Sequence, residues 1–284
     1  MSFSSKKTEF PVRKSTGELE PYNRGKVLNS LLRTGIGKER AEKILRRAEA
    51  KFFPQISTFE IYEILKDELK KDFLLDFYHK YNLKKSLYKL GPTGYPFEKF
   101  VAKILQEYGY RTEVDVVFQG RCVQHEVDVV ALKKGKFQLV ECKFHNSPGI
   151  KTDVKVPLYI KARIDDILES PENFEIRKEK MGGGWIFTNT KFTKDAISYA
   201  ECVGLRVTAW NYPKENSIQK IIEKKGLYPI TILEEPEDLL SEALKQGIIT
   251  IKDFLNMKEI AMRIFGEKYL KLRILVQGLV EYAK

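Results

Sequence analysis

The stretch from residue 121 to 144, RCVQHEVDVVALKKGKFQLVECKF, constrains the fold of this chain most strongly. Two runs rich in valine and leucine flank the polar segment Lys133-Lys134-Gly135-Lys136, which predicts a β-hairpin. A two-residue loop and a four-residue loop both place Asp128 directly opposite Glu141. Opposed residues have Cβ atoms only about 4.5–5.5 Å apart, where two like charges are destabilising. The pair therefore indicates a cation between the two strands.

Lys143 lies two positions after Glu141 and so faces the same side of the strand. A lysine near a metal-bound water can orient that water or offset charge during phosphoryl transfer. Carboxylate oxygens without a histidine or cysteine cluster suit Mg²⁺ or Mn²⁺ better than zinc. The hairpin thus predicts a divalent-metal site with Asp128 and Glu141 as ligands.

Strict alternation along the first strand places Asp128 on one face with Gln124, Glu126 and Val130. His125 falls on the opposite face with Val127, which favours core packing over metal binding for that histidine. Cys142 also points away from Glu141, which favours packing over chemistry.

A helix predicted over residues 96–107 supplies a further acid. Pro96 suits the first helical turn, and a buried stripe is formed by Phe97, Phe100, Val101, Ile104 and Leu105. Glu98 falls inside that stripe, where a carboxylate must be paired, hydrogen-bonded or coordinated. A surface hairpin with one Lys–Glu pair would explain Glu141 and Lys143, but it explains neither Glu98 nor Asp128. We therefore expect Glu98 to join the catalytic and metal-binding group.

These residues resemble a known family. GPTGYPFEKFVAKILQEYGY, HEVDVVA, QLVECKF and WIFTNTKFTKDAISYAECVGLRV occur in the order found in Mrr-like PD-(D/E)xK endonucleases. The resemblance covers about 88–212 and implies a mixed central sheet flanked by helices. It also implies Asp128 and Glu141 as metal ligands, Lys143 as the catalytic lysine and Glu98 as the supporting helix acid. Cys142 departs from the bulkier apolar residue common at its position.

The N-terminal segment combines a predicted hairpin over residues 10–22 with three helices. Asn23 is a good N-cap for the first helix, and Ser57 with Glu60 predicts a capping box for the third. VRKSTGELEPYNRGKVLNSLL resembles the ATP-cone domain, with Ser15 and Thr16 departing from its usual basic and acidic residues. The resemblance implies ATP or dATP binding through Lys14 and Lys26, with Glu20 and Asn23 near the ribose or base. A small helical domain with ordinary surface lysines is the alternative.

The charge balance favours a polyanionic partner. Lysine and arginine number 50 against 39 acidic residues, giving a net charge of +11, and such a surface attracts nucleic acid. No apolar run approaches the roughly 20 residues that span a bilayer, so no membrane association is expected. The three scattered cysteines indicate reduced thiols and a cytoplasmic protein. Candidate phosphate contacts, which a solvated helix face would explain equally well, are Lys151, Lys155, Lys161 and Arg163.

The sequence as a whole predicts an α/β (α+β) protein. The expected parts are an ATP-cone-like nucleotide-binding domain with a helical connector (1–85), a nuclease domain with a mixed sheet (86–215) and a C-terminal helical domain (216–284). The last of these faintly resembles a helix-hairpin-helix unit, although ordinary helical packing or dimerisation explains it better. A homo-oligomer is compatible with this organisation.

The predicted function is metal-dependent hydrolysis of DNA phosphodiester bonds, regulated by ATP or dATP. One alternative is a nucleotide-sensing DNA-binding regulator with an inert nuclease fold. Another is a structure-selective repair or junction nuclease. The filled catalytic positions argue against the first, and the lack of a recognisable sequence-reading module leans slightly toward the second.

Overall fold

The chain divides into two compact units, residues 1–84 and residues 85–284. The computed structural model describes residues 10–14, 16–72, 75–173 and 182–281. The boundary between the units falls within helix α4 (Leu75–Tyr88), and each unit is described by itself. The predicted division of the second unit near residue 215 stays a prediction.

The first unit is a short hairpin followed by three helices. Its elements are β1 (Pro11–Arg13), β2 (Leu19–Pro21), α1 (Arg24–Leu32), α2 (Lys38–Glu49) and α3 (Thr58–Lys71). The Asn23 side chain caps α1, and Ser57 and Glu60 form the predicted capping box of α3. One apolar core joins the hairpin to the three helices: Val12, Leu31, Ile36, Ala41, Ile44, Leu45, Ala48, Ile56, Ile61, Leu65, Leu69 and Tyr78.

The second unit is built on a five-stranded mixed sheet with the order β3-β4-β5-β7-β9. Strands β3, β4 and β5 are antiparallel, whereas β5, β7 and β9 are parallel. The strands are β3 (Arg111–Gln119), β4 (Gln124–Lys133), β5 (Lys136–Lys143), β7 (Gly184–Thr188) and β9 (Arg206–Ala209). The expected mixed sheet flanked by helices is confirmed.

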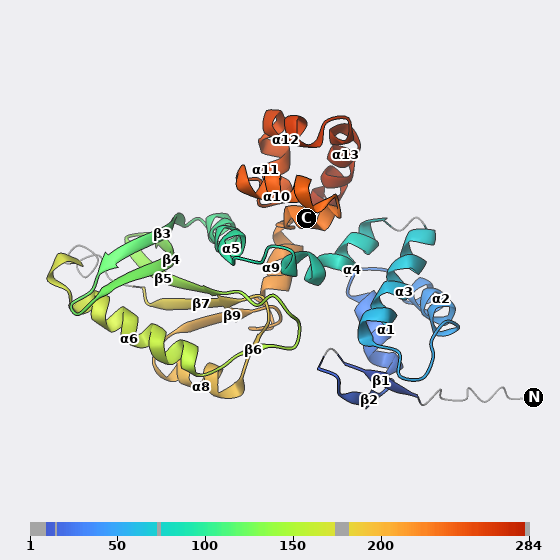
Figure 1. Cartoon of the computed structure of the whole chain (residues 1–284), viewed down its shortest axis with the longest axis horizontal. Coiled ribbons are helices and arrows are strands. Elements are labelled where there is room, and N and C mark those ends of the chain that lie inside the picture. The colour runs from blue at the N-terminus through green and yellow to red at the C-terminus, as the bar shows by residue number, and fades with distance from the viewer. Residues whose placement is uncertain (1–9, 15, 73–74, 174–181, 282–284) are drawn as a thin grey trace, which may run out of the picture. The chain divides into compact units, whose positions relative to one another are not determined.

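Helices cover both faces of this sheet (Figure 1). Helix α5 (Tyr95–Glu107) lies on one face, and α6 (Lys155–Glu169) and α8 (Lys194–Cys202) lie on the other. Two short strands, β6 (Lys151–Thr152) and β8 (Lys191–Phe192), pair in parallel beside α6 and α8. A 3₁₀ turn, η1 (Pro171–Asn173), follows α6.

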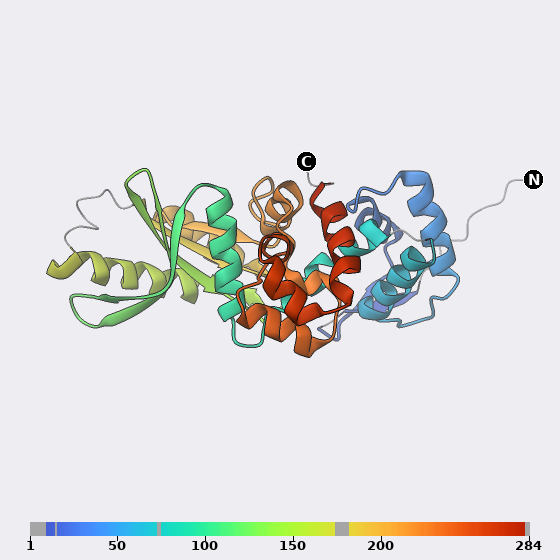
Figure 2. The same cartoon turned by 90° about the horizontal axis from the view of Figure 1, so that it is seen from above.

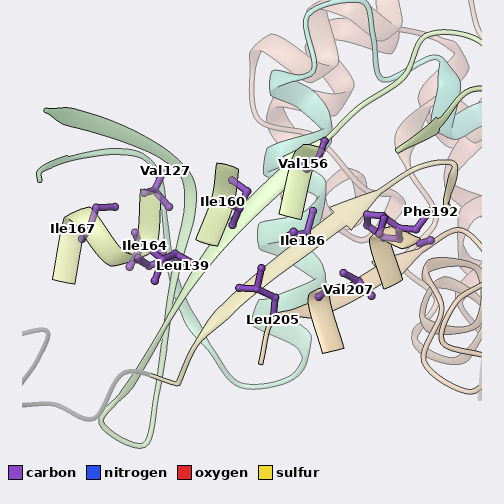
Figure 3. Packing of buried hydrophobic residues seen from close by; sticks show 14 residues of the cluster. Val127, Leu139, Val156, Ile160, Ile164, Ile167, Ile186, Phe192, Leu205 and Val207 are labelled. Atoms are coloured by element: carbon purple, nitrogen blue, oxygen red, sulfur yellow. The ribbon is translucent and has the colours of Figure 1, made fainter. Parts of the chain in front are cut away.

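The core between the sheet and α6 fixes the position of that helix. Ile160, Ile164 and Ile167 of α6 pack toward Leu139 of β5 and Ile186 of β7 (Figure 3). These isoleucines recur at helical spacing, so a single stripe of α6 is buried. Arg163, which precedes Ile164 in α6, reaches Glu141 of β5.

The C-terminal helices lie next to α5 on its side of the sheet (Figures 1 and 2). Ion pairs join them to α5: Lys103 to Asp253 at 2.7 Å and Lys252 to Glu107 at 2.6 Å. The elements are α9 (Ile218–Lys225), η2 (Ile230–Leu233), α10 (Glu237–Lys245), α11 (Ile251–Asn256), α12 (Lys258–Phe265) and α13 (Lys268–Glu281). Within the described ranges, no helix is long and apolar enough to cross a membrane.

Candidate active site

The β4–β5 hairpin has the register that the sequence predicts. Lys133 pairs with Lys136 around a two-residue turn, and the pairing continues to Val129 opposite Val140. Lys134 and Gly135 both have positive φ, 52° and 68°, as a type I′ turn requires. Asp128 and Glu141 are the next positions on the two strands. The backbone N–H of Cys142 donates to Asp128 Oδ2 at 2.6 Å, so the Asp128 side chain reaches toward β5.

The β3–β4 ladder is interrupted at the same place. Val114 pairs with Val129 and Val116 pairs with Val127, but the intervening Asp115 and Asp128 do not pair. Asp115 has a φ of 55°, a left-handed conformation that is rare in a strand. The irregular backbone is therefore confined to two facing aspartates.

This interruption also changes which side chains face α6. Val127 and Val130 both belong to the core beneath α6, although they are three residues apart in one strand. Regular alternation cannot place both on one face. The strict alternation predicted from Gln124 to Val130 is therefore wrong at Asp128, although β4 keeps the same pairing register with β3 on both sides of it.

Glu98 joins Asp128 from the first turns of α5. Burial, the Asp128 charge and a hydrogen bond with Asp115 together raise the pKa of Glu98 to about 8. Burial and the nearby Glu141 raise the pKa of Asp128 to about 7, although the Cys142 N–H opposes the shift. Two half-buried carboxyl groups thus keep a proton near neutral pH because burial and neighbouring carboxylates outweigh the groups that favour their ionised form. A hard divalent cation bound among these oxygens would remove that cost.

Glu141 is held mainly by α6. Tyr159 donates its hydroxyl to Glu141 Oε1 at 2.8 Å, and Arg163 Nη1 lies 2.7 Å from Glu141 Oε2. Glu141 nevertheless lies close enough to Asp128 to raise its pKa. Arg163 was one of the candidate phosphate contacts, and its guanidinium is instead used by this carboxylate.

Lys143 ends β5 on the same face as Glu141 and pairs with Thr188 of β7. The structure therefore gathers Glu98, Asp128 and Glu141 where α5, β4 and β5 meet, with Lys143 one pleat beyond. Among the described residues, however, no three acidic, histidine or cysteine side chains converge on one point as a ready-made metal site. The chemistry of the donor set suits Mg²⁺ or Mn²⁺, while the Glu141 side chain is engaged elsewhere.

The sequence predicted no role at this site for Asp115 or Tyr159, and it predicted Arg163 as a phosphate contact and not as a partner of Glu141. Asp115 lies in a run that reads as an ordinary alternating strand, so only its positive φ reveals it. Tyr159 and Arg163 belong to a helix whose packing on the sheet brings them to Glu141. Their four-residue spacing on α6 is the one local signal that they act together.

His125 forms a hydrogen bond with a carboxylate of α6. Its Nε2 lies 2.7 Å from Asp166 Oδ2, and the same carboxylate accepts the backbone N–H groups of Cys122 and Val123. These hydrogen bonds lower the pKa of Asp166 to about 2, with the His125 contact as the largest cause. His125 therefore fastens the tip of the β3–β4 connection to α6 rather than filling the core.

The predicted nucleotide residues cluster in the first unit. Lys14 Nζ lies 3.0 Å from Glu20 Oε2, and Lys26 Nζ lies 3.6 Å from the same oxygen. Asn23 Oδ1 accepts the backbone N–H of Lys26 at 2.9 Å and so caps α1. The hydrogen bond with Lys14 is the largest cause of the lowered pKa of Glu20. The residues are brought together, and their role in nucleotide binding stays a prediction.

Comparison with known proteins places the second unit in a family. The family model Mrr_cat, described as a restriction endonuclease, matches residues 91–214. An uncharacterized protein of Archaeoglobus fulgidus is 39% identical over 173 residues, which cover 61% of this chain and 94% of that protein. A crystal structure of a protein of unknown function shares 37% identity with a TM-score of 0.54, covering 66% of this chain and 97% of that one. This chain belongs to the family of that archaeal protein, and its residues 91–214 form a restriction-endonuclease domain.

Proposed function

We propose that this protein is a metal-dependent DNA endonuclease whose catalytic residues are Glu98, Asp128, Glu141 and Lys143. The observation that carries the proposal is the pair of half-buried carboxyl groups, Glu98 and Asp128, whose pKa values are raised to about 8 and about 7. Perturbed acids of this kind concentrate at functional sites. They stand in a restriction-endonuclease domain, for which DNA is the expected substrate.

Asp128, Glu141 and Glu98 are the residues that would hold a Mg²⁺ or Mn²⁺ ion. An ion held there would activate a water molecule and would offset charge on the scissile phosphate. Without the ion, Glu98 holds a proton at neutral pH because its pKa is about 8. The Cys142 N–H orients Asp128 through Oδ2, and within the described residues no hydrogen bond to Oδ1 is found, so Oδ1 can bind a ligand.

Lys143 is the residue that would supply a positive charge beside the scissile phosphate. It ends β5 beside Thr188 and shares a face with Glu141. Its ammonium group can therefore approach a phosphate bound at the acid cluster, which is formed by Glu98, Asp128 and Glu141. Its positive charge would stabilise the negative charge that develops on the phosphate oxygens. Lys143→Ala should therefore reduce the cleavage rate strongly and leave DNA binding largely intact.

The test of this function is Mg²⁺- or Mn²⁺-dependent cleavage of a panel of plain, methylated, branched and single-stranded DNA. Asp128→Ala and Lys143→Ala should each abolish cleavage, while Glu113→Gln, an exposed acid on the neighbouring strand β3, should not. Preference for branched DNA would identify a structure-selective nuclease. Intact DNA binding without cleavage of any substrate would refute the catalytic assignment and favour an inert DNA-binding regulator.

We further propose that the first unit resembles an ATP-cone closely enough to bind ATP or dATP. Support comes from Lys14 and Lys26, which meet at the Glu20 carboxylate beside the N-terminal turn of α1. Two lysines at a helix N-terminus can hold phosphate groups that displace this carboxylate. Asn23 and Glu20 would then contact the ribose or base.

Calorimetric titration of the full chain with ATP and dATP tests this nucleotide site. Lys14→Ala combined with Lys26→Ala should abolish binding, whereas Lys38→Ala on α2 should leave it unchanged. Equal binding by all three proteins would refute the assigned residues. Regulation is tested separately by adding nucleotide to the cleavage assay and to a measurement of oligomeric state, and an absence of effect on both would refute it.

A further inference from the structure

Both carboxylate oxygens of Glu141 accept hydrogen bonds from side chains of α6. Tyr159 donates to Oε1 at 2.8 Å, and Arg163 Nη1 lies 2.7 Å from Oε2. The same Nη1 donates to the backbone carbonyl of Glu126 at 3.1 Å, so Arg163 joins β4 to β5. The Glu141 side chain is only 12% exposed, which leaves little room for additional ligands while these contacts persist.

Packing fixes these contacts in place. Tyr159 and Arg163 are four residues apart and lie on one side of α6, with the guanidinium carbon 5.5 Å from the centre of the Tyr159 ring. The adjacent stripe of α6 (Ile160, Ile164 and Ile167) is buried against the sheet (Figure 3). The two side chains are therefore held at Glu141 by a rigid helix rather than by a surface loop.

Arg163 is also the positive group that reaches the acid cluster. Of the four acids Glu98, Asp115, Asp128 and Glu141, only Glu141 forms an ion pair with a basic side chain of the described residues, and that side chain is Arg163. The guanidinium lowers the pKa of Asp128 as well, against the effects of burial and of Glu141. The Arg163 guanidinium thus offsets part of the negative charge of Glu141 and Asp128, which a divalent cation would also offset.

We propose that Tyr159 and Arg163 form a latch that holds Glu141 in the metal-free protein and competes with the divalent cation for it. This inference rests on the proposed metal-dependent function. A cation that takes Glu141 as a ligand competes with Arg163 for the charge of this carboxylate, so the latch lowers the apparent affinity for the cation. Tyr159 and Arg163 are positioning residues that act through Glu141.

The experiment is titration of the full chain with Mn²⁺ in the absence of DNA, with free Mn²⁺ followed by electron paramagnetic resonance. Arg163→Gln replaces the guanidinium with a shorter, polar and uncharged side chain, and should tighten Mn²⁺ binding by about tenfold. Tyr159→Phe removes one neutral hydrogen bond and should tighten it by about two- to threefold. Urea unfolding checks that both variants fold.

A matched control separates the latch from a general change in charge. Lys161 lies on the same helix and pairs with Asp165, so Lys161→Gln removes one positive charge without touching Glu141. Its Mn²⁺ affinity should stay within about twofold of wild type, since exposed charges are largely screened. In addition, Arg163→Gln should give no gain in a Glu141→Gln background.

Three results would overturn the latch: unchanged or weaker Mn²⁺ binding by Arg163→Gln, an equal gain in Lys161→Gln, or a gain that persists in the Glu141→Gln background. Weaker binding would mean that Arg163 supports Glu141 as a ligand instead of competing with the ion. A wild-type chain that binds no Mn²⁺ at all is a different result. It would refute the proposed function, and the latch would fall with it.

Discussion

Replacing Asp128 with asparagine should stabilise the second unit at pH 8 in the presence of a chelator, and should stabilise it by less than half as much at pH 5. Burial and Glu141 raise the pKa of Asp128 from its ordinary 3.8 to about 7 in the folded protein. An acid with a raised folded pKa contributes stability that is fully present below its unfolded pKa. That contribution is lost progressively as the pH rises from about 4 to about 7, so roughly a third of it is already lost at pH 5. Asparagine is neutral throughout and can still accept the Cys142 N–H.

The size of the effect follows from the pKa shift. Each pKa unit corresponds to about 1.4 kcal/mol, so a shift of about three units sets an upper limit of about 4 kcal/mol. Asp128 is only partly buried and coupled to its neighbours, and solvent screening reduces the figure to roughly half, about 2 kcal/mol. For a unit of this size, 2 kcal/mol should raise the melting temperature by about 4–8 °C.

Tryptophan fluorescence reports this unit alone, since the chain has two tryptophans, Trp185 and Trp210, and both lie in it. Thermal and urea unfolding in chelator at pH 5 and pH 8 would compare wild type, Asp128→Asn and the exposed control Glu113→Gln. The control should match wild type at both pH values. The reasoning is refuted if Asp128→Asn is destabilised at pH 8, or if its effect is the same at both pH values.

Three further outcomes are expected. Asp115→Ala should destabilise the second unit by about 1 kcal/mol, because alanine is strained at a φ of 55°. Asp115→Gly should relieve that strain, and urea unfolding compares the stability of the two variants. Asn23→Ala should cost the first unit about 1 kcal/mol of stability by removing the α1 cap, while Asn29→Ala should not, as followed by circular dichroism. Asp166→Asn should speed hydrogen exchange at the two backbone amides that its carboxylate accepts. The wild-type protection there should be lost as the pH falls from about 4 toward 2, because the folded pKa is lowered to about 2.

Local sequence signals predicted the parts of the fold that depend on local physics. The Lys134-Gly135 turn selects the hairpin register, because two positive φ values are needed there and glycine supplies one of them freely. The caps at Asn23 and Ser57 are likewise satisfied within three residues of chain. The opposed positions of Asp128 and Glu141 followed from the register alone.

The unpredicted features depend on contacts between distant segments. Tyr159 and Arg163 reach Glu141 from 18 and 22 positions along the chain, and only the packing of α6 on the sheet determines that contact. The left-handed backbone of Asp115 is invisible in a run that otherwise alternates as a regular strand. Local sequence patterns therefore indicate which acids belong to the site, but they do not indicate which side chains from distant segments form hydrogen bonds with those acids.

The interruption of the sheet and the acid cluster occur at the same residues, and each helps to explain the other. A regular ladder at Asp115 and Asp128 would keep both side chains in strict alternation, as the sequence predicts. The break lets Val127 and Val130 both face the core of α6, while Asp128 stays near Glu98 of α5. Helices on both faces of the sheet thus contribute to one cluster at the edge of the regular pairing. Because the backbone there is set by packing on both sides, binding of a cation would require a rearrangement of side chains, with Glu141 as the first to move.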